Sequence, residues 1–537
     1  MRNRGMRNIG RFIAGIVLCT LFIIGGVALQ QVAAETVLRV AMTAGDVPIT
    51  IGQPDQGFEG YRFVGYSLYD PLILWDLSRA DVVADLRPGL ATSWAVDPAD
   101  PHRWLLELRQ GVQWHDGCAF TAADVVWNFA RVTNDKVPQF HPKQFALIRD
   151  RMANIETIEA LEDYKIALTT RQVDALLPYQ LSYWFMISRC KLESLKHDYA
   201  AYQQNPSGTG PYKFVKFVTQ ERLELVKNPD YWDKNRIPKH DRLVLIPMPE
   251  ATTRAAALLS NQVDFVEAPL PDTIPRLQSA GMQIVTNGYP HNWAYQFNFV
   301  DGAFKDIRVR KAANLALNRA DMKELLRGYM IESYSTLLPS MSYYGEPSFK
   351  ITYDPKQAIA LLKEAGCYPC AITLAISTSG SGQMQPLPMN ELVKAQLEAV
   401  GFKVKLAVMD WNALLDLVRP GRTKAPEIDG INVSRSMQDP YSALIRHVYT
   451  KAQAPSGSNW GHYSNPAVDA LIEEIYATFD RQAQLAKLTK LNEMLTDDAV
   501  MLWVAHDVNP RALHPRVHGF VQAQSWFQDL TPIRIAD

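Results

Sequence analysis

With 537 residues, the chain is too long for a single hydrophobic core, and we expect two or three domains. A hydrophobic fraction of 47% and a charged fraction of 21% are typical of a globular protein. The formal net charge of −1 argues against a nucleic-acid groove or a basic membrane-binding patch.

The N-terminal 34 residues have the pattern of a secretion signal. Arginines at positions 2, 4, 7 and 11 precede an apolar run over 12–29, and small residues at 32–34 come before Glu35. We predict that residues 1–34 are a cleaved signal peptide and that the mature protein is periplasmic. An uncleaved membrane anchor is the alternative, because about 18 apolar residues is at the lower edge of a membrane span. Without a twin-arginine pair, the general secretion route is favoured.

A first buried strand is expected at 36–42. The segment 88–132 then carries three local signals. Alternating apolar residues at 104–109 predict a strand, and Trp-His-Asp-Gly at 114–117 predicts a turn. Thr121-Ala-Ala-Asp124 is a capping box, and the apolar face that follows it predicts an amphipathic helix.

Strand and helix patterns alternate along the rest of the chain. Further strands are expected at 213–218, 222–226, 243–246, 295–299, 371–376, 403–409 and 501–505. Further helices are expected at 250–261, from Pro355 behind Asp354, from Pro466 behind Asn465, and at 481–496. This alternation predicts an α/β or mixed α+β protein.

Three segments resemble one known family. The first is PGLATSW followed by LRQGVQWHDG and TAADV, all within 88–132. The second is GTGPY followed by NPDYW, within 208–232, and the third is FKDIRVRKA followed by ALNR, within 304–319. The chain resembles the solute-binding proteins of ABC importers of the peptide, nickel and opine type, the bacterial extracellular solute-binding protein family 5.

The resemblance implies a two-lobed periplasmic-binding-protein fold of the cluster C type, with an inserted subdomain. Lobe I would comprise 35–79, 206–290 and 506–537, residues 80–205 would form the inserted subdomain, and lobe II would comprise 291–505. The lobes would close on a solute by hinge bending, and ABC permease and ATPase subunits would recognise the closed form. We expect a monomer without a cofactor, a nucleic-acid partner or catalytic activity.

The segment before Pro440 bears on the ligand. In peptide-binding members of the family, an Asp three residues before the acidic residue of an acid-Pro phrase pairs with the α-ammonium of the peptide. Here the acid is Asp439, and Ser436 occupies the earlier position. A neutral hydroxyl cannot supply a charge-assisted bond, so ordinary peptides with a free N-terminus are not favoured. Arg435 suits a carboxylate or another oxyanion, with a structural salt bridge as the alternative.

Loops at strand ends supply the other candidates. In the resembling family the loop after the first strand faces the cleft between the lobes, which points to Tyr61 and Arg62; a surface loop is the alternative. The remaining candidates for ligand binding are Asn292, Trp293, Tyr295, Trp411 and Trp460. Each tryptophan has core packing as its alternative, and we expect one or two of them to stack on ligand.

No metal or catalytic motif stands out. The eleven histidines are scattered, without an H-E-x-x-H, and there is no G-x-S-x-G elbow. Cys367 and Cys370 form a C-x-x-C after a helix end, without the helix N-terminus that activates thioredoxin-like cysteines. A small structural disulfide is possible in an oxidising compartment, and idle thiols, half a metal site or a redox pair are the alternatives.

We therefore predict the substrate-binding component of an ABC importer for a peptide-like or opine-like solute. An oligosaccharide stacked on Trp293 or Trp460 is the alternative ligand. From another class, an exported thiol oxidoreductase would use Cys367 and Cys370. A third possibility is a receptor that presents ligand to a membrane sensor, and neighbouring permease and ATPase genes would distinguish it from a transporter component.

Overall fold

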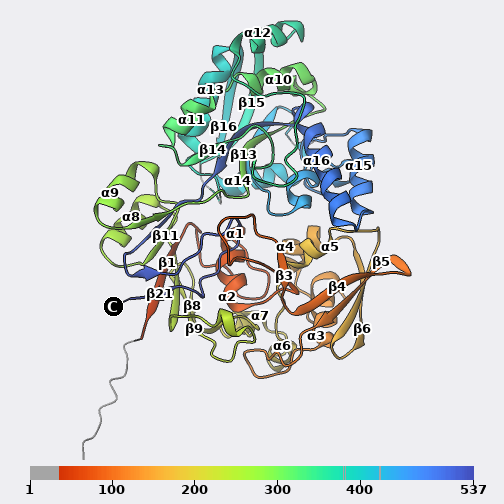
Figure 1. The fold of residues 1–537 in the computed structure, drawn as a ribbon, viewed down its shortest axis with the longest axis vertical. Helices are drawn as coiled ribbons and strands as arrows, with labels where there is room; N and C mark the ends of the chain where they lie inside the picture. Colours follow the sequence, from red (N-terminus) through yellow and green to blue (C-terminus); the bar gives the residue numbers. More distant parts are fainter. Residues whose placement is uncertain (1–34, 379, 381, 423–424, 537) are drawn as a thin grey trace, which may run out of the picture. The chain divides into compact units, whose positions relative to one another are not determined.

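Three sheets organise the part of the chain that the computed structural model describes, which is residues 35–378, 380, 382–422 and 425–536 (Figure 1). The predicted signal peptide lies outside these residues. We refer to the part built on the seven-stranded sheet as lobe I, the part built on the six-stranded sheet as lobe II, and the part built on the four-stranded sheet as the inserted subdomain.

Lobe I has a mixed seven-stranded sheet. Its strands, in spatial order, are β12 (Gln283–Val285), β19 (Arg511–Leu513), β11 (Phe265–Glu267), β1 (Val37–Met42), β10 (Arg242–Pro247), β9 (Arg222–Lys227) and β8 (Tyr212–Val218). The expected first strand is confirmed: β1 lies in the sheet interior, parallel to both β10 and β11. Its near-continuous burial is what a parallel strand covered on both faces requires.

Short helices accompany this sheet. They are α1 (Phe58–Gly60), the π-helical turn η1 (Tyr61–Gly65), α2 (Tyr66–Leu68), α8 (Ala251–Leu259) and α9 (Ile274–Ser279). Leu258 of α8 and Leu277 of α9 pack with Ala41 and Val266 of the sheet in one apolar cluster. The segment 57–62, expected to be a loop, is therefore largely helical.

Lobe II has a six-stranded sheet. Its strands, in spatial order, are β14 (Met330–Glu332), β18 (Met501–Asp507), β13 (His291–Phe297), β17 (Gly430–Ser436), β15 (Cys370–Ser377) and β16 (Phe402–Met409). All seven residues of β13 and all seven of β18 are buried, because helices and loops cover both faces of the sheet.

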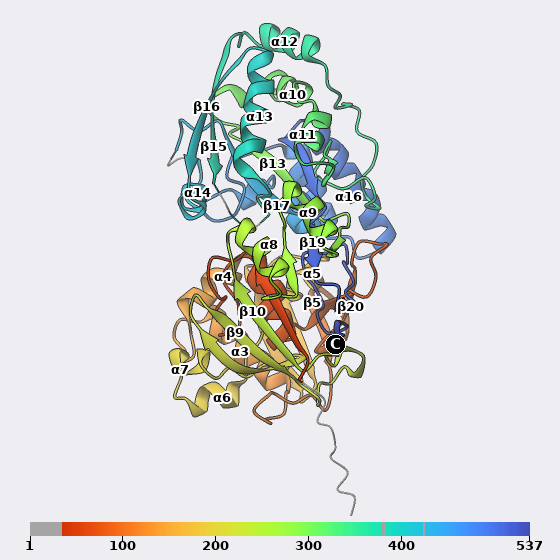
Figure 2. The same cartoon turned by 90° about the vertical axis from the view of Figure 1, so that its left-hand side faces the viewer.

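The helices of lobe II form two groups. One apolar cluster packs α10 (Ile307–Leu315), α11 (Arg319–Leu325), α12 (Pro355–Glu364) and α13 (Pro386–Ala399) against the sheet (Figures 1 and 2). A separate cluster packs α14 (Trp411–Val418) on Ile431 and Val433 of β17. The helix pair α15 (Pro466–Tyr476) and α16 (Arg481–Asp497) begins where the caps predict: Asn465 accepts from the Ala467 backbone N–H at 3.0 Å.

The inserted subdomain has an antiparallel four-stranded sheet. It is built from β4 (Ala91–Asp97), β5 (Asp100–Leu108), β7 (Lys165–Thr170) and β6 (Ile155–Glu162), with α3 (Ala122–Thr133), α4 (Pro142–Met152), α5 (Leu177–Leu181), α6 (Arg189–Ser194) and α7 (Tyr199–Gln203). The predicted capping box starts α3: the Asp124 carboxylate accepts from the Thr121 backbone N–H at 2.9 Å. The remaining strands form two hairpins, β2 (Ile73–Trp75) with β3 (Leu86–Pro88) and β20 (Val517–His518) with β21 (Arg534–Ile535).

The chain crosses from one large sheet to the other at two adjacent segments. Residues 286–290 join β12 to β13, and residues 508–510 join β18 to β19. The two crossings lie side by side, since the Asn287 backbone N–H donates to the Val508 carbonyl at 3.2 Å. These observations agree with the two-lobed mixed α/β fold, while the residue boundaries of the domains stay a prediction.

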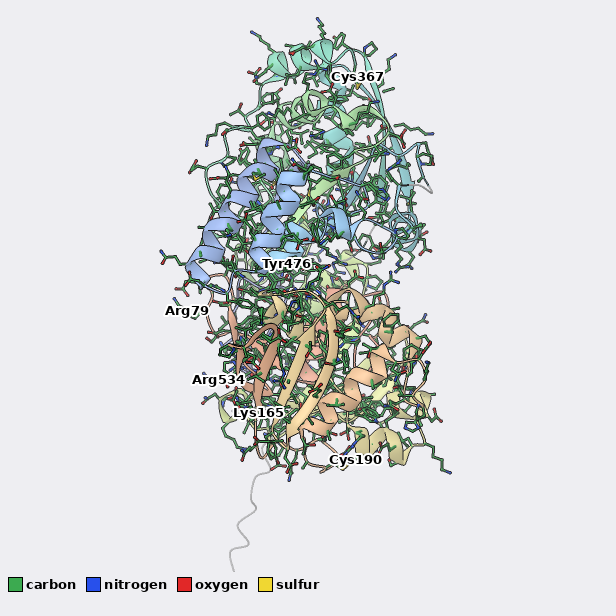
Figure 3. The ribbon with its side chains drawn as sticks, turned by 90° about the vertical axis from the view of Figure 1, so that its right-hand side faces the viewer. Arg79, Lys165, Cys190, Cys367, Tyr476 and Arg534 are labelled. Carbon is green, nitrogen blue, oxygen red and sulfur yellow. A yellow bond between two sulfur atoms is a disulfide. The ribbon has the colours of Figure 1, made fainter. Side chains whose placement is uncertain are left out.

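Within the described residues, two disulfides are formed. Cys367 is bonded to Cys370 just before β15, and Cys118 is bonded to Cys190, which ties the turn before α3 to α6. The second pair was not expected, because its cysteines are 72 residues apart in sequence. Figure 3 shows Cys367 and Cys190 at opposite ends of the molecule, with Tyr476 between them. Within the described residues, no helix is long and apolar enough to cross a bilayer.

Candidate ligand-binding site

Lobe I and lobe II meet at the start of β13 and the end of β17. There the Pro290 carbonyl accepts from the Met437 backbone N–H at 2.8 Å and from the indole Nε1 of Trp526 at 2.7 Å. The Gln438 side-chain Oε1 accepts from the Trp526 backbone N–H at 2.8 Å. Because Trp526 comes from the C-terminal segment and Gln438 from lobe II, we call this region the interlobe boundary.

Ion pairs join α4 of the inserted subdomain to lobe II at this boundary. The Arg151 guanidinium lies 3.4 Å from the Asp439 carboxylate, which is fully buried and also accepts from the Tyr183 hydroxyl at 2.9 Å. A second pair joins Arg446 to Asp150 at 3.1 Å. Asp439 was expected to contact ligand; in the structure its carboxylate is engaged by Arg151 and Tyr183, and a ligand contact stays a prediction.

Arg435 has no such partner. Its guanidinium is buried, lies 3.1 Å from both ring nitrogens of His447, and donates to the Gln296 side-chain oxygen. Among the described residues no carboxylate forms an ion pair with it. Burial, together with the nearby Arg446, lowers the pKa of Arg435 to about 9. A buried cation without an anion is unfavourable by several kcal/mol, so Arg435 stays a candidate for binding an anionic ligand.

A second group of side chains lacks partners on the other face of β17. Both ring nitrogens of His291, both side-chain polar atoms of Gln383 and the Nε2 of Gln438 are buried without a hydrogen bond. Each unsatisfied buried group is unfavourable by about 1–3 kcal/mol. Trp526 lies beside them, with its ring centroid 5.0 Å from that of His291. We call His291, Gln383 and Gln438 the polar cluster.

Aromatic rings border the polar cluster on the lobe I side. The ring of Trp526 lies 4.3 Å from Phe58 and 4.9 Å from Tyr289, measured between centroids. Tyr61 lies one step further, 5.7 Å from Phe58 and 5.9 Å from Tyr183. Burial raises the pKa of Tyr61. The expected position of Tyr61 near the interlobe boundary therefore agrees with the structure, although its contact with ligand stays a prediction.

Arg62 lies in a buried ion cluster at the lobe crossings. Its guanidinium lies 2.7 Å from the Glu267 carboxylate and donates to the Tyr289 hydroxyl at 2.8 Å, while Arg511 lies 2.8 Å from the same Glu267 oxygen. Burial raises the pKa of the neighbouring Glu59 to about 8, and the charge of Glu267 adds to the effect. This side chain ties lobe I to the crossing segment 286–290, and its contact with ligand stays a prediction.

Three predicted residues lie in strand β13 and not in a loop. Trp293 and Tyr295 are fully buried in the apolar cluster under α10 and α13, and the Tyr295 hydroxyl donates to the Asn390 side chain. The amide of Asn292 donates to the Ser333 hydroxyl at 3.0 Å and to the Ser335 carbonyl at 2.8 Å. Because side chains of a central strand pack against both covering layers, these residues serve the core of lobe II.

Trp460 and Trp411 differ from each other. Trp460 is fully buried and packs with Leu414 and Ile431, so the expectation of a stacking platform is corrected to core packing. Trp411 is the first residue of α14, and its ring lies against Gly380 in the loop after β15. Gln383 of the polar cluster belongs to the same loop, so this loop connects Trp411 to the polar cluster.

Ser436 lies opposite His291 in the β13–β17 ladder. Its hydroxyl accepts from the Gln438 backbone N–H at 3.3 Å. Several residues of this site were not predicted from the sequence: Arg151, His291, Gln383, Gln438 and Trp526. No local motif marks them, since they come from five separate segments and gather only in the folded protein.

Comparison with known proteins identifies the family. Residues 85–464 match the model of bacterial extracellular solute-binding proteins, family 5. The chain is a family 5 solute-binding protein.

Similar members are named for different ligands. Heme-binding protein A of Haemophilus influenzae is 26% identical over 472 residues, covering 82% of each chain. Di/tripeptide-binding protein 2 of Pseudomonas aeruginosa is 25% identical over 513 residues, covering 90% of this chain and 92% of that protein. The crystal structure of DppA from Helicobacter pylori in complex with the peptide STSA has a TM-score of 0.80 at 23% identity, covering 94% and 99%. This structural similarity shows that the chain shares the fold of that protein.

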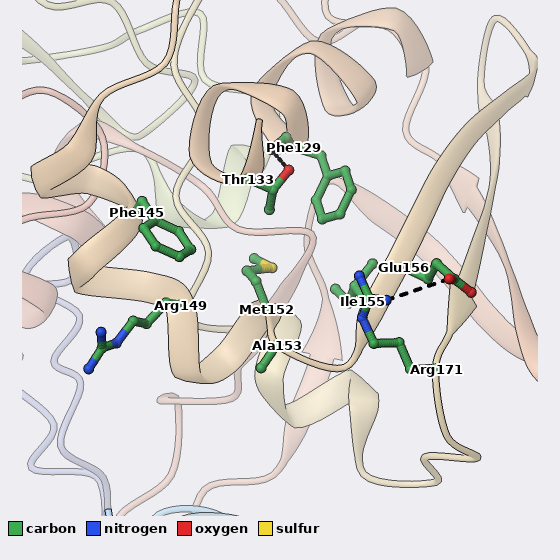
Figure 4. Close-up of a pocket in the computed structure, with 9 residues that line it drawn as sticks. All are labelled: Phe129, Thr133, Phe145, Arg149, Met152, Ala153, Ile155, Glu156 and Arg171. Carbon is green, nitrogen blue, oxygen red and sulfur yellow. Dashed lines mark hydrogen bonds and ion pairs between the residues drawn. The ribbon is translucent and has the colours of Figure 1, made fainter. Parts of the chain in front are cut away.

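Other features of the described chain have weaker support as ligand-binding sites. A pocket on the inserted subdomain is lined by residues of α3, α4 and β6 and their neighbours: Phe129, Thr133, Phe145, Arg149, Met152, Ala153, Ile155, Glu156 and Arg171 (Figure 4). None of them belongs to the polar cluster. In the part of the chain that the structure describes, no group of three His, Cys, Asp or Glu side chains could hold a metal ion.

Proposed function

We propose that this solute-binding protein captures an anionic, peptide-like or opine-like solute in the periplasm and delivers it to an ABC permease and ATPase. The single observation that carries the anionic character is Arg435, a buried cation at the interlobe boundary without a carboxylate partner in the described chain. Guanidinium groups bind carboxylates through paired, charge-assisted hydrogen bonds. A bound carboxylate would supply the charge that Arg435 lacks.

The names of similar proteins support the proposed ligand class. Similar proteins are named for di- and tripeptides and for glutathione, and one similar structure holds agropinic acid. Peptide-like and opine-like solutes carry carboxylates, which Arg435 suits. Ser436 lacks the charge that an α-ammonium would need, so a solute with a blocked or absent amino group is favoured. The oligosaccharide alternative has less support, because Trp293 and Trp460 pack in apolar cores.

Binding and delivery follow from closure of the lobes. Two adjacent crossing segments, 286–290 and 508–510, would act as the hinge, and a solute that contacts both lobes binds the closed form more tightly than the open form. Because the solute favours the closed form, the permease recognises a loaded protein by its closed form. No covalent step is needed, and the Cys367–Cys370 disulfide lies at the start of β15, whereas the loop that carries Gln383 follows the end of β15.

A thermal-shift screen tests the proposal. The mature chain is heated with a library that contains anionic, N-blocked, zwitterionic and uncharged compounds. A ligand at 100 times its Kd stabilises the folded state by about 2.7 kcal/mol, which is a clear rise in Tm. We expect the largest shifts from carboxylates that lack a free amino group. Largest shifts from plain dipeptides or neutral sugars would contradict the proposed function.

A further inference from the structure

The polar cluster has a chemistry distinct from that of Arg435. His291 begins β13, Gln383 lies in the loop after β15, and Gln438 follows β17. The three segments meet around Trp526, which contacts His291, approaches Gly382 beside Gln383, and donates its backbone N–H to Gln438. Arg435 points to the opposite face of the sheet from Ser434 and Ser436, because side chains alternate along a strand. The charged Arg435 therefore lies on one face at the end of β17, and the uncharged polar cluster lies on the other face.

The unpaired atoms of the polar cluster include both donors and acceptors. Gln438 Oε1 already accepts from the Trp526 backbone, which leaves its NH₂ group as a free donor. Gln383 offers an NH₂ group and a carbonyl oxygen, and a neutral imidazole at His291 offers one donor and one acceptor. An ammonium has donors alone and a carboxylate has acceptors alone, whereas an amide has one N–H and one C=O. The set matches an uncharged group that has both a donor and an acceptor, and in a peptide-like solute the amide is such a group.

The surroundings of the cluster keep it uncharged. Burial lowers the pKa of His291 to about 3, with the neighbouring His506 adding to the effect. Asp507 lies 3.9 Å from His291 Nδ1, and burial raises the pKa of Asp507. Arg62 lies 5.6 Å from the Trp526 ring and pairs with the Glu267 carboxylate, which Arg511 also contacts.

We propose that His291, Gln383 and Gln438 form a subsite for an uncharged amide group of the solute, such as the acylated nitrogen of an N-blocked peptide. This inference rests on the proposed function. The backbone of Gly382 closes one side of the subsite: a Cβ at that position would lie 2.8 Å from His291 Nε2 and 3.0 Å from Trp526. Trp526 provides a flat aromatic surface on which a planar amide packs.

Four forms of one dipeptide, Ala-Ala, test both proposals separately. They are the free dipeptide, the N-acetyl dipeptide, the dipeptide amide and the N-acetyl dipeptide amide, and each is titrated into the wild-type protein by calorimetry. The subsite predicts that acetylation lowers the Kd at least 10-fold, whether or not the C-terminus is amidated. The proposed function predicts that amidation of the C-terminus raises the Kd at least 10-fold, whether or not the N-terminus is acetylated.

The outcomes are distinct. Free and acetylated forms that bind equally, with the carboxylate still required, would overturn the subsite and leave the anionic ligand in place. A preference for acetylated forms that ignores the carboxylate would support the subsite and overturn the anionic ligand. Failure of all four forms to bind at millimolar concentration would overturn both for peptide-like solutes.

Variants assign the effect to residues. Gln383→Met and Gln438→Met remove the amide groups at nearly constant volume, and each is expected to raise the Kd for N-acetyl-Ala-Ala about 10-fold. Gln482→Met, on the exposed first turn of α16, is the matched control and should leave the Kd unchanged. Ser436→Asp, opposite His291, places a carboxylate beside the subsite and should shift the preference toward free Ala-Ala. An unchanged preference in all three site variants would contradict the subsite.

Discussion

Arg435 lies 3.1 Å from both ring nitrogens of His447, a contact between a cation and a group that cannot neutralise it. Burial and the charge of Arg435 lower the pKa of His447, so the imidazole stays neutral. The neighbouring arginines are paired, Arg151 with Asp439 and Arg446 with Asp150. Of these three arginines, Arg435 alone has no carboxylate partner among the described residues.

Replacing Arg435 by glutamine should not destabilise the ligand-free protein. The variant removes an unpaired buried charge, whose desolvation is unfavourable, and keeps a polar group beside Gln296. Thermal unfolding without ligand should give a Tm equal to or above that of the wild type. A fall in stability of more than about 1 kcal/mol, beyond the usual range for a benign substitution, would show that the guanidinium is a structural element and not a ligand group.

Asp439→Asn should destabilise the protein strongly. The substitution leaves Arg151 without its partner, and breaking a buried ion pair by removing one member typically costs about 3–5 kcal/mol. Urea unfolding of both proteins measures the difference. Asp416→Asn removes an exposed carboxylate that pairs with Arg419 and should change stability by less than about 1 kcal/mol. Equal effects of the two substitutions would contradict the interlobe role of Asp439.

Glu59 should make stability depend on pH. Burial raises its pKa to about 8, above the ordinary value of 4.5, so the folded protein holds a proton that the unfolded chain releases. This contribution is complete below pH 4.5 and is lost as the pH rises toward 8. Glu59→Gln mimics the protonated form, so the stability of the variant should fall less between pH 5 and pH 8.5. Parallel pH profiles for variant and wild type, from urea unfolding, would show that Glu59 is ionised in the folded state.

The two disulfides should contribute unequally. The Cys118–Cys190 bond closes a segment of 72 residues, whereas Cys367 and Cys370 are three residues apart. Cross-links that close long loops restrict the unfolded chain more, so removing the long-range bond should cost about 2–5 kcal/mol and removing the short one less. Paired Cys→Ser variants compared by calorimetry decide this. Insulin reduction that is lost in Cys367→Ser would instead favour the oxidoreductase alternative.

The parts of the fold encoded locally were predictable from the sequence. Thr121, Asp354 and Asn465 cap the helices that their sequence context indicates, because a cap depends on a few neighbouring residues. The strand predicted at 501–505 lies within β18, which continues to Asp507. The strand predicted at 295–299 overlaps only the end of β13, which begins at His291 and ends at Phe297.

The binding residues were harder to predict because they depend on tertiary contacts. Trp293 and Trp460 are of a residue type that often stacks on ligands, yet each packs in an apolar core. Trp526 and His291 are separated by most of lobe II in sequence and meet only because the chain returns to lobe I through the second crossing. Arg62 was expected in a loop after β1, but the π-helical turn η1 directs it to Glu267.

The most direct test of the anionic-ligand proposal is a ligand–variant cycle measured by calorimetry. The Kd of an N-acetyl dipeptide and of its C-terminal amide are compared in the wild type and in Arg435→Gln. We predict that the carboxylate form binds at least 10-fold more tightly in the wild type, since a hydrogen bond to a charged group contributes about 1.5–3 kcal/mol. The same ratio should fall to about 1 in Arg435→Gln. A ratio that is unchanged by the substitution would contradict the assignment of Arg435 as the carboxylate-binding residue.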